Sequence, residues 1–274
     1  MYANSKASSA SSPTTVPRLR EMKGKGEKIV ALTAYDVSFA AACDAAGIDI
    51  ILVGDSLGMV VQGHSSTLPV SIDDMVYHTA AAARGTSNAL LVADLPFMSF
   101  RNPEAALVSS ARLMAEGGAA MVKLEGADYV IEVIDALVRR SVPVCAHLGL
   151  TPQSVHKLGG YRVQGKTKAA AEQLFADAKA VEDAGVDVLV LECVPAALAK
   201  RITDELSIPT IGIGAGADCD GQVLVIYDML GITHGKRPCF SKNFLAGNDS
   251  IVDAIRAYAS AVRKKEFPAA EHSF

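Results

Sequence analysis

The run IILVGD at residues 50–55 is one of four apolar stretches that each end on a carboxylate. The others are ALLVAD (89–94), AAMVKLE (119–125) and VDVLVLE (186–192). Such continuous runs are typical of strands buried on both faces, so each acid is expected where a core strand meets a loop. In a barrel of parallel strands those ends meet at one mouth, where a ring of acids indicates a reaction centre or a metal site.

One unit recurs around these runs: a helix of small residues, a glycine turn, a strand and a loop. Gly47, Gly117 or Gly118, and Gly185 stand where the helices end and a left-handed residue is needed. Strands that alternate with helices predict a parallel sheet. We expect strands near residues 28–33, 50–54, 89–93, 119–124, 143–147, 187–191, 209–213 and 222–227. Eight strands in about 250 residues predict an α/β fold, a single-domain (β/α)8 TIM barrel.

The alternative fold is a doubly wound sheet, but no GxGxxG motif follows the first strand, and GKGEK at 24–28 lacks the spacing of a P-loop. We expect the barrel to span residues 18–274 after a flexible arm at 1–17. The arm is inferred because the first twenty residues are rich in Ser, Ala and Thr and contain no acid. A transit peptide would share that lack of acids, but bases are few and no amphipathic stripe is visible.

The composition of the chain indicates which kinds of ligand and which cellular location to expect. The chain has 274 residues, 50% of them hydrophobic, and a formal net charge of -4, which fits one large domain without a strongly basic face. Nucleic acid and anionic membranes are therefore not expected as partners, whereas small molecules are. The 5 cysteines show no CxxC spacing, which argues against disulfides and zinc and predicts a cytoplasmic location. No signal peptide or membrane span is evident.

Each acid also has a structural interpretation. An Asp just after a strand is a good N-cap for the next helix, so Asp55 or Asp94 alone could be a cap. Glu caps poorly, and Glu125 and Glu192 are therefore better candidates for a proton acceptor. An ion pair with a neighbouring barrel residue is their alternative role.

Two further polar residues lie on the predicted strands. Lys123 and Glu125 are two apart and face the same way, so they could neutralise each other, or Lys123 could bind a substrate carboxylate. His147 ends the fifth strand at the same mouth as the acids, although a lone strand histidine is usually structural. The run GIGAG at 212–216 follows the seventh strand, where many barrels bind phosphate; close backbone packing is the favoured interpretation.

Two aspartates form an oxygen-only site that suits Mg²⁺, because this ion keeps open positions for water or a chelating substrate. Such an ion beside a glutamate predicts enolate chemistry. In that chemistry the metal chelates a 2-oxo acid, the base takes the adjacent proton, and the ion stabilises the developing charge. The pattern predicts a reaction class and no particular substrate.

Longer segments make the chain similar to a known family, ketopantoate hydroxymethyltransferase, in the superfamily of phosphoenolpyruvate/pyruvate-type barrels. The resemblance runs from about Thr15 to Phe274, and the long GDSLGMV and HLGLTPQS stretches are its most specific parts. The segments that carry it are ALTAYD (31–36), LVGDSLGMVVQGHSSTLPVSIDDMVYHTAAAARG (52–85), LVADLPFMSF (91–100), MVKLEG (121–126), VCAHLGLTPQSVHKLGGYRVQGK (144–166), LVLECVP (189–195), PTIGIGAG (209–216) and FPAAEHSF (267–274).

The resemblance implies an enzyme with one Mg²⁺ per subunit that transfers a hydroxymethyl group from 5,10-methylenetetrahydrofolate to 3-methyl-2-oxobutanoate. The product would be 2-dehydropantoate, in the synthesis of pantothenate and so of coenzyme A. The reaction would proceed through a Mg²⁺-stabilised enolate. The resemblance also implies a homodecamer.

The same resemblance implies residue roles. Asp55 and Asp94 match the metal ligands, and Glu125 lies close by and acts through metal-bound water. Glu192 matches the general base. Contacts with the substrate are implied for Asp55, Ser56, Asp94, Lys123 and His147.

Two competing functions are open at this point. A Mg²⁺-dependent barrel such as an isocitrate lyase-like C–C lyase would share the enolate chemistry, but its usual KKCGH-like loop is not in the sequence. A barrel that has lost catalysis and serves only in binding or assembly is the other function. The intact acids, Lys123 and His147 argue against it, because buried charge is costly to keep.

Overall fold

A closed barrel of eight parallel strands in chain order forms the centre of the molecule in the computed structural model, which describes residues 13–274. Each strand pairs with the next, and β8 closes onto β1. The strands are β1 (Ile29–Thr33), β2 (Ile50–Val53), β3 (Leu90–Asp94), β4 (Met121–Glu125), β5 (Val144–Gly149), β6 (Val188–Glu192), β7 (Thr210–Ile213) and β8 (Gly221–Leu224). The predicted (β/α)8 barrel is confirmed, and every expected strand overlaps an observed one.

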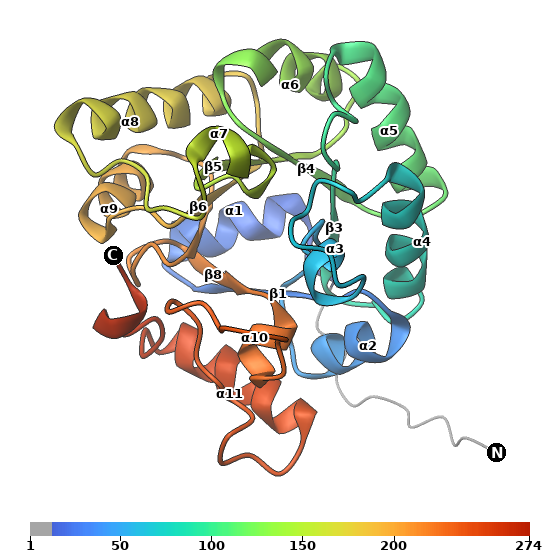
Figure 1. The fold of residues 1–274 in the computed structure, drawn as a ribbon, viewed down its shortest axis with the longest axis vertical. Helices are drawn as coiled ribbons and strands as arrows, with labels where there is room; N and C mark the ends of the chain where they lie inside the picture. Colours follow the sequence, from blue (N-terminus) through green and yellow to red (C-terminus); the bar gives the residue numbers. More distant parts are fainter. Residues whose placement is uncertain (1–12) are drawn as a thin grey trace.

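Helices between the strands surround the barrel (Figure 1). The α-helices are α1 (Val16–Lys25), α2 (Val37–Ala45), α3 (Leu57–Val60), α4 (Ile72–Ala83), α5 (Pro103–Ala115), α6 (Ile131–Val138), α7 (Val155–Leu158), α8 (Lys168–Asp183), α9 (Ala196–Glu205), α10 (Ile226–Leu230) and α11 (Ile251–Arg263). Short 3₁₀ turns are η1 (Asp128–Val130), η2 (Pro152–Ser154) and η3 (Ala270–His272). Gly47 and Gly185 have the positive φ predicted where helices end.

The amino-terminal arm expected over residues 1–17 lies mostly outside the described residues. The Thr14 N–H donates to the Asn88 carbonyl at 2.7 Å. Helix α1 begins at Val16 with Thr15 as its N-cap. The helix therefore begins within the expected arm, two residues before the predicted domain boundary.

Successive side chains along each strand point alternately into the barrel and outward, which produces two apolar cores. On β1, Ile29 and Ala31 face the barrel interior, whereas Val30 and Leu32 pack outward against the helices. Every residue of β1 is buried, as the continuous apolar pattern predicts for a parallel strand. Most of the inner core is formed by residues in the amino-terminal and middle parts of the strands. Polar side chains can therefore occupy the carboxyl ends.

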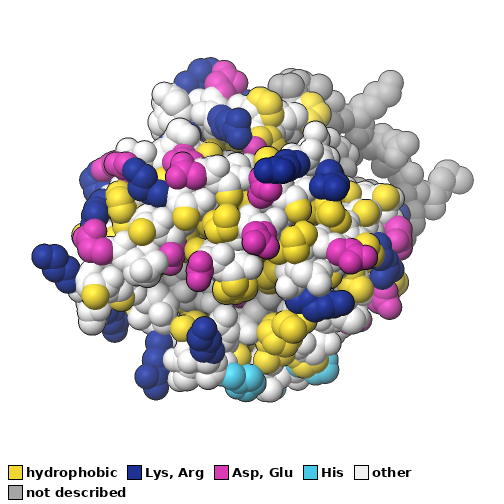
Figure 2. Space-filling view, turned by 90° about the horizontal axis from the view of Figure 1, so that it is seen from above, with side chains coloured by type: hydrophobic (Ala, Val, Ile, Leu, Met, Phe, Trp, Pro, Cys, Tyr) yellow, Lys and Arg dark blue, Asp and Glu magenta, His cyan; other side chains and the backbone are white. Residues whose placement is uncertain are grey.

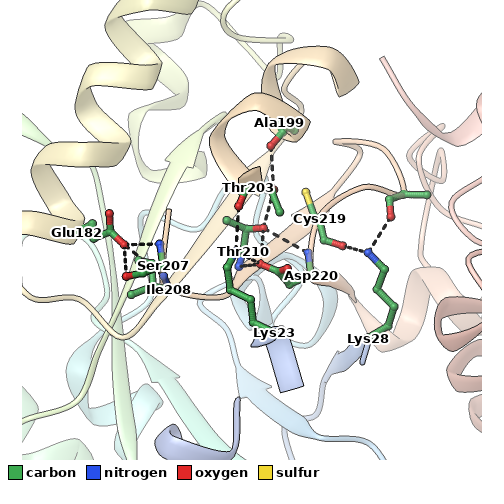
Figure 3. A network of polar contacts seen from close by, with 11 residues as sticks. Lys23, Lys28, Glu182, Ala199, Thr203, Ser207, Ile208, Thr210, Cys219 and Asp220 are labelled. Atoms are coloured by element: carbon green, nitrogen blue, oxygen red, sulfur yellow. Dashed lines mark hydrogen bonds and ion pairs between the residues drawn. The ribbon is translucent and has the colours of Figure 1, made fainter. Parts of the chain in front are cut away.

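Helix α1 closes the barrel at the amino-terminal ends of the strands. Leu19 and Met22 belong to the inner core together with the first residues of several strands. The ammonium of Lys23 donates to Asp220 at 2.7 Å and to the Thr203 carbonyl at 2.9 Å (Figure 3). These contacts fasten the helix at the end opposite to the predicted mouth.

Leu19→Ala is expected to destabilise the fold by about 3 kcal/mol, because Leu19 is fully buried and the space it leaves would be lined by rigid strand residues. Urea unfolding followed by circular dichroism measures the change. Val108→Ala, at a residue 59% exposed on α5, is the matched control and should change the free energy of unfolding by less than about 0.5 kcal/mol. Equal effects of the two substitutions would show that α1 does not seal the barrel.

The surface has a mixed charge. On the face drawn in Figure 2, basic and acidic side chains are interspersed over the upper and middle parts, whereas basic side chains and histidine lie along the lower left edge. All five cysteines are free thiols. Among residues 13–274 no helix has both the length and the apolar character needed to cross a bilayer.

Candidate active site

Strand alternation directs the predicted site residues into the barrel mouth. Asp94 stands two residues after the inward-facing Val92, and Glu192 stands two after the inward-facing Val190. Side chains two apart share a face, so the last residues of these strands also point inward at their carboxyl ends. The same alternation directs the side chains of Lys123, Glu125 and His147 inward, because Met121 and Cys145 on their strands belong to the inner core. The structure therefore brings these side chains together at one mouth.

Asp55, Asp94 and Lys123 form one buried polar cluster. One Asp94 oxygen, Oδ2, accepts the Asp55 N–H at 3.0 Å, and the other, Oδ1, accepts the Lys123 ammonium at 2.5 Å. Asp94 and Lys123 are paired residues on β3 and β4. The direct ion-pair partner of Lys123 is therefore Asp94 on the neighbouring strand, and Glu125 on its own strand acts only through its nearby charge.

Neither aspartate caps a helix. Helix α3 follows Asp55, but its N-cap is Ser56, which makes no side-chain cap bond. Helix α5 has Asn102 as its N-cap, far along the loop from Asp94. The capping interpretation is therefore wrong for both residues, and their carboxylates are available to the mouth.

Gln153, in the turn η2, joins two acids of the mouth, Asp55 after β2 and Glu125 at the end of β4. Its backbone N–H donates to Glu125 at 3.0 Å, and its side-chain amide donates to Asp55 at 2.9 Å and to the Leu95 carbonyl at 2.9 Å. Gln153 was not among the predicted site residues, because an amide does not titrate and a lone Gln has no motif spacing. The only indication in the sequence that Gln153 belongs to the site is its position in the HLGLTPQS segment, one of the most specific parts of the family resemblance.

His147 lies between two glutamates. Its Nε2 is 3.2 Å from Glu192 and its Nδ1 is 3.5 Å from Glu125, although neither contact is aligned as a hydrogen bond. Burial and the Lys123 charge lower the pKa of His147, but the two glutamates raise it more, to about 9. The imidazole is therefore a cation at neutral pH. The ion-pair role considered for Glu125 and Glu192 is thus present, and His147 is the shared partner.

The His147 charge predicts a pH-dependent stability. Because the folded pKa of about 9 lies above the usual value of 6.5, protonation stabilises the fold fully below that usual value. The contribution disappears as the pH rises through the folded value. In metal-free protein, the gap in unfolding free energy between the wild type and His147→Gln should shrink by more than about 1 kcal/mol from pH 6 to pH 10. A pH-independent gap would contradict the assignment of a charged imidazole.

Glu192 is the most accessible of the four acids at the mouth. Its side chain is 13% exposed, whereas those of Asp94 and Glu125 are 4% and 2% exposed. Cys193, the next residue, has a positive φ of 48°, an uncommon conformation for a residue other than glycine. The chain turns sharply after Glu192, whose carboxylate stays partly exposed at the mouth.

Hydroxyl groups complete the rim. The Ser56 hydroxyl is 2.9 Å from the phenol of Tyr35. Burial raises the pKa of Tyr35, so its proton is retained. Tyr161 donates to the Met59 sulfur at 3.4 Å and so connects the loop after β5 to α3. Sequence reasoning identified Ser56 and missed the two tyrosines.

The GIGAG segment packs closely against other chain segments. Gly214 has a φ of 63°, and a Cβ there would lie 3.1 Å from side-chain atoms of Phe240 and of Phe274. A Cβ at Gly216 would lie 2.7 Å from that of Ala196. These contacts favour the packing interpretation of the glycines over phosphate binding.

The charge of the mouth fits a divalent cation. Burial and the neighbouring charges of Asp94 and Glu125 raise the pKa of Asp55 well above its ordinary value, so the cluster is short of positive charge. A cation held by two carboxylates would relieve this repulsion, and Mg²⁺ commonly binds through one or two protein carboxylates with water completing its shell. Among residues 13–274 no three His, Cys, Asp or Glu side chains are placed as a ready-made ligand group.

Comparison with known proteins gives the family. The family described as ketopantoate hydroxymethyltransferase matches residues 13–270. The chain belongs to this family. It is 59% identical over 262 residues to the 3-methyl-2-oxobutanoate hydroxymethyltransferase of Alkalilimnicola ehrlichii, covering 96% of this chain and 95% of that protein. The enzyme of the same name from Thiobacillus denitrificans is 59% identical, over 96% of this chain and 100% of that protein. The expected enzyme class, a hydroxymethyltransferase, is confirmed.

Solved structures share the fold. Phosphonopyruvate hydrolase is similar with a TM-score of 0.60 at 16% sequence identity, over 80% of this chain and 83% of that one. A 2,3-dimethylmalate lyase, described as a member of the PEP mutase/isocitrate lyase superfamily, has a TM-score of 0.56 at 18% identity, over 76% of this chain and 80% of that one. At these identities the likeness concerns the barrel and does not extend to the reaction.

Proposed function

We propose that this hydroxymethyltransferase moves a one-carbon unit from 5,10-methylenetetrahydrofolate to C3 of 3-methyl-2-oxobutanoate, giving 2-dehydropantoate for pantothenate and coenzyme A synthesis. The observation that carries the proposal is the position of Glu192. It is an accessible carboxylate held beside a charged imidazole, at the same mouth as Asp55 and Asp94. A base and a cation-binding pair on one rim suit removal of a proton next to a 2-oxo group.

The two aspartates are the proposed Mg²⁺ ligands, with Glu125 beside them. Asp94 also fixes the Lys123 ammonium, and Gln153 orients Asp55 and Glu125. When bound, Mg²⁺ would polarise the 2-oxo group and stabilise the charge that develops on it. One solved neighbour, phosphonopyruvate hydrolase, is described as a complex with oxalate and Mg²⁺, which supports this choice of metal for the shared barrel.

The chain's own residues then perform the proton transfer. We assign Lys123 and Ser56 to binding the carboxylate and oxo oxygens of the substrate. His147 holds the Glu192 carboxylate in a fixed orientation, because its Nε2 lies 3.2 Å from it. Glu192 accepts the C3 proton, and C3 bonds to the methylene carbon of the folate. Both bonds from that carbon to folate nitrogens break, and water supplies the hydroxyl group of the product. The folate nitrogens take up the C3 proton and the remaining water proton, so tetrahydrofolate leaves.

Incubation of the enzyme with both substrates and Mg²⁺ tests the reaction, with the product identified by mass spectrometry. Formation of 2-dehydropantoate is expected. Cleavage of a C–C bond in a 2-alkylmalate without any transfer would favour the lyase function instead. The decameric assembly and the cytoplasmic location stay predictions from the sequence.

A further inference from the structure

A cavity of about 430 Å³ lies between the loop after α10 and the carboxyl-terminal turn η3. The loop contributes Thr233, Lys236 and Arg237 to its wall, and η3 contributes Glu271 and His272. None of these residues takes part in the proton transfer described above. The cavity is therefore a second polar site that the mechanism leaves without a ligand.

The walls of the cavity are tied to the rim that carries Glu192. Ala196, four residues after Glu192, donates its N–H to the carbonyl of Phe274 at 2.8 Å. Phe274 also packs with Phe240 against Gly214, just beyond the end of β7. At the other side, the Thr233 hydroxyl donates to the buried Asp228 of α10 and anchors the start of the loop. The cavity thus lies beside the mouth, next to the ends of β6 and β7.

The cavity is electropositive. Lys236 and Arg237 are exposed, and neither forms an ion pair with another residue of the described chain. Glu271 contributes one opposing charge to the lining. Burial lowers the pKa of His272, and the positive charges of Lys242 and Arg237 lower it further, against the opposing effect of Glu271. An anionic ligand would find unpaired cations here and would allow the imidazole to become protonated.

We propose that this cavity binds the glutamate carboxylates of the folate cosubstrate, an inference that rests on the proposed function. Folate is an elongated molecule with its one-carbon unit at the pterin end and its carboxylates at the other. When the methylene carbon is near Glu192, the glutamate must extend out of the mouth. Arg237 offers a planar guanidinium for bidentate contact with a carboxylate, and Lys236 adds a second cation beside it.

Steady-state kinetics with two forms of the cosubstrate test the proposal. Arg237→Ala should raise the KM for 5,10-methylenetetrahydrofolate by about tenfold, the loss of one charge-assisted contact. With the corresponding tetrahydropteroate, which lacks the glutamate, the same variant should behave like the wild type. Lys264→Ala, at an exposed lysine outside the cavity lining, is the control and should leave both KM values within about twofold.

Three results would overturn the proposal. The first is an unchanged folate KM in Arg237→Ala when the wild type transfers normally, which leaves the proposed function intact. The second is an equal penalty with the pteroate cosubstrate, which would place the defect away from the carboxylates. The third is calorimetric binding of glutarate or phosphate that Arg237→Ala abolishes without altering the folate KM, because the cavity would then serve a separate anion. A wild type without any transfer activity would instead remove both the proposed function and this inference.

Discussion

Glu192→Gln is expected to lower turnover at least about a hundredfold, because a positioned general base contributes typically 10²- to 10⁴-fold to a proton transfer. The amide keeps the size of the carboxylate but cannot accept the C3 proton. The 2-oxo acid should still bind, since Glu192 lies at the edge of the mouth and is separate from the Asp55 and Asp94 pair. Steady-state rates of 2-dehydropantoate formation, with substrate binding measured by calorimetry, give both quantities.

The control for this substitution is Glu104→Gln, at an exposed residue in the first turn of α5. It changes the same functional group without reaching the mouth and should retain wild-type turnover. If Glu192→Gln is nearly as active as this control, Glu192 is not the base. A loss of substrate binding equal to the loss of turnover would instead assign Glu192 to binding.

Asp55→Asn and Asp94→Asn are expected to weaken Mg²⁺ binding by more than about tenfold each, because an amide oxygen carries no charge to offset that of the ion. Asp94→Asn should have the additional effect of releasing Lys123, whose ammonium is 2.5 Å from the carboxylate. Titration calorimetry with Mg²⁺ measures the affinity, and the concentration of Mg²⁺ needed for half-maximal activity gives an independent value.

Asp183→Asn, at an exposed residue at the end of α8, is the matched control for the metal titrations. It should bind Mg²⁺ as the wild type does. Unchanged affinity in both Asp55→Asn and Asp94→Asn would place the ligands elsewhere on the chain.

The barrel and its mouth were predictable from the sequence because both follow from local patterns. Runs such as VDVLVLE are mostly apolar and end on an acid. They therefore predict both a buried parallel strand and the position of Glu192 at its carboxyl end. The side-chain period of two then places Asp94 and Glu192 in the same phase as the inner core. Residue roles and the substrate came from the resemblance to the family, since periodicity alone predicted only a reaction class.

Pairings across strands were not predictable in the same way. The partner of Lys123 is Asp94, on the neighbouring strand, and this choice depends on the register between β3 and β4. The bridge made by Gln153 depends on how the turn η2 folds back over the mouth. Such contacts join residues far apart in the chain, and a single sequence carries no signal for them.

Exchange of the C3 hydrogen of 3-methyl-2-oxobutanoate with solvent, measured without folate, tests the central claim most directly. Tritium at C3 should be lost to water in the presence of the wild-type enzyme and Mg²⁺. Exchange should fall at least about a hundredfold in Glu192→Gln and should stop when a chelator removes the metal. Retention of the label by the wild type with Mg²⁺, or undiminished exchange in Glu192→Gln, would contradict the account of this mouth as a site of Glu192-dependent proton abstraction.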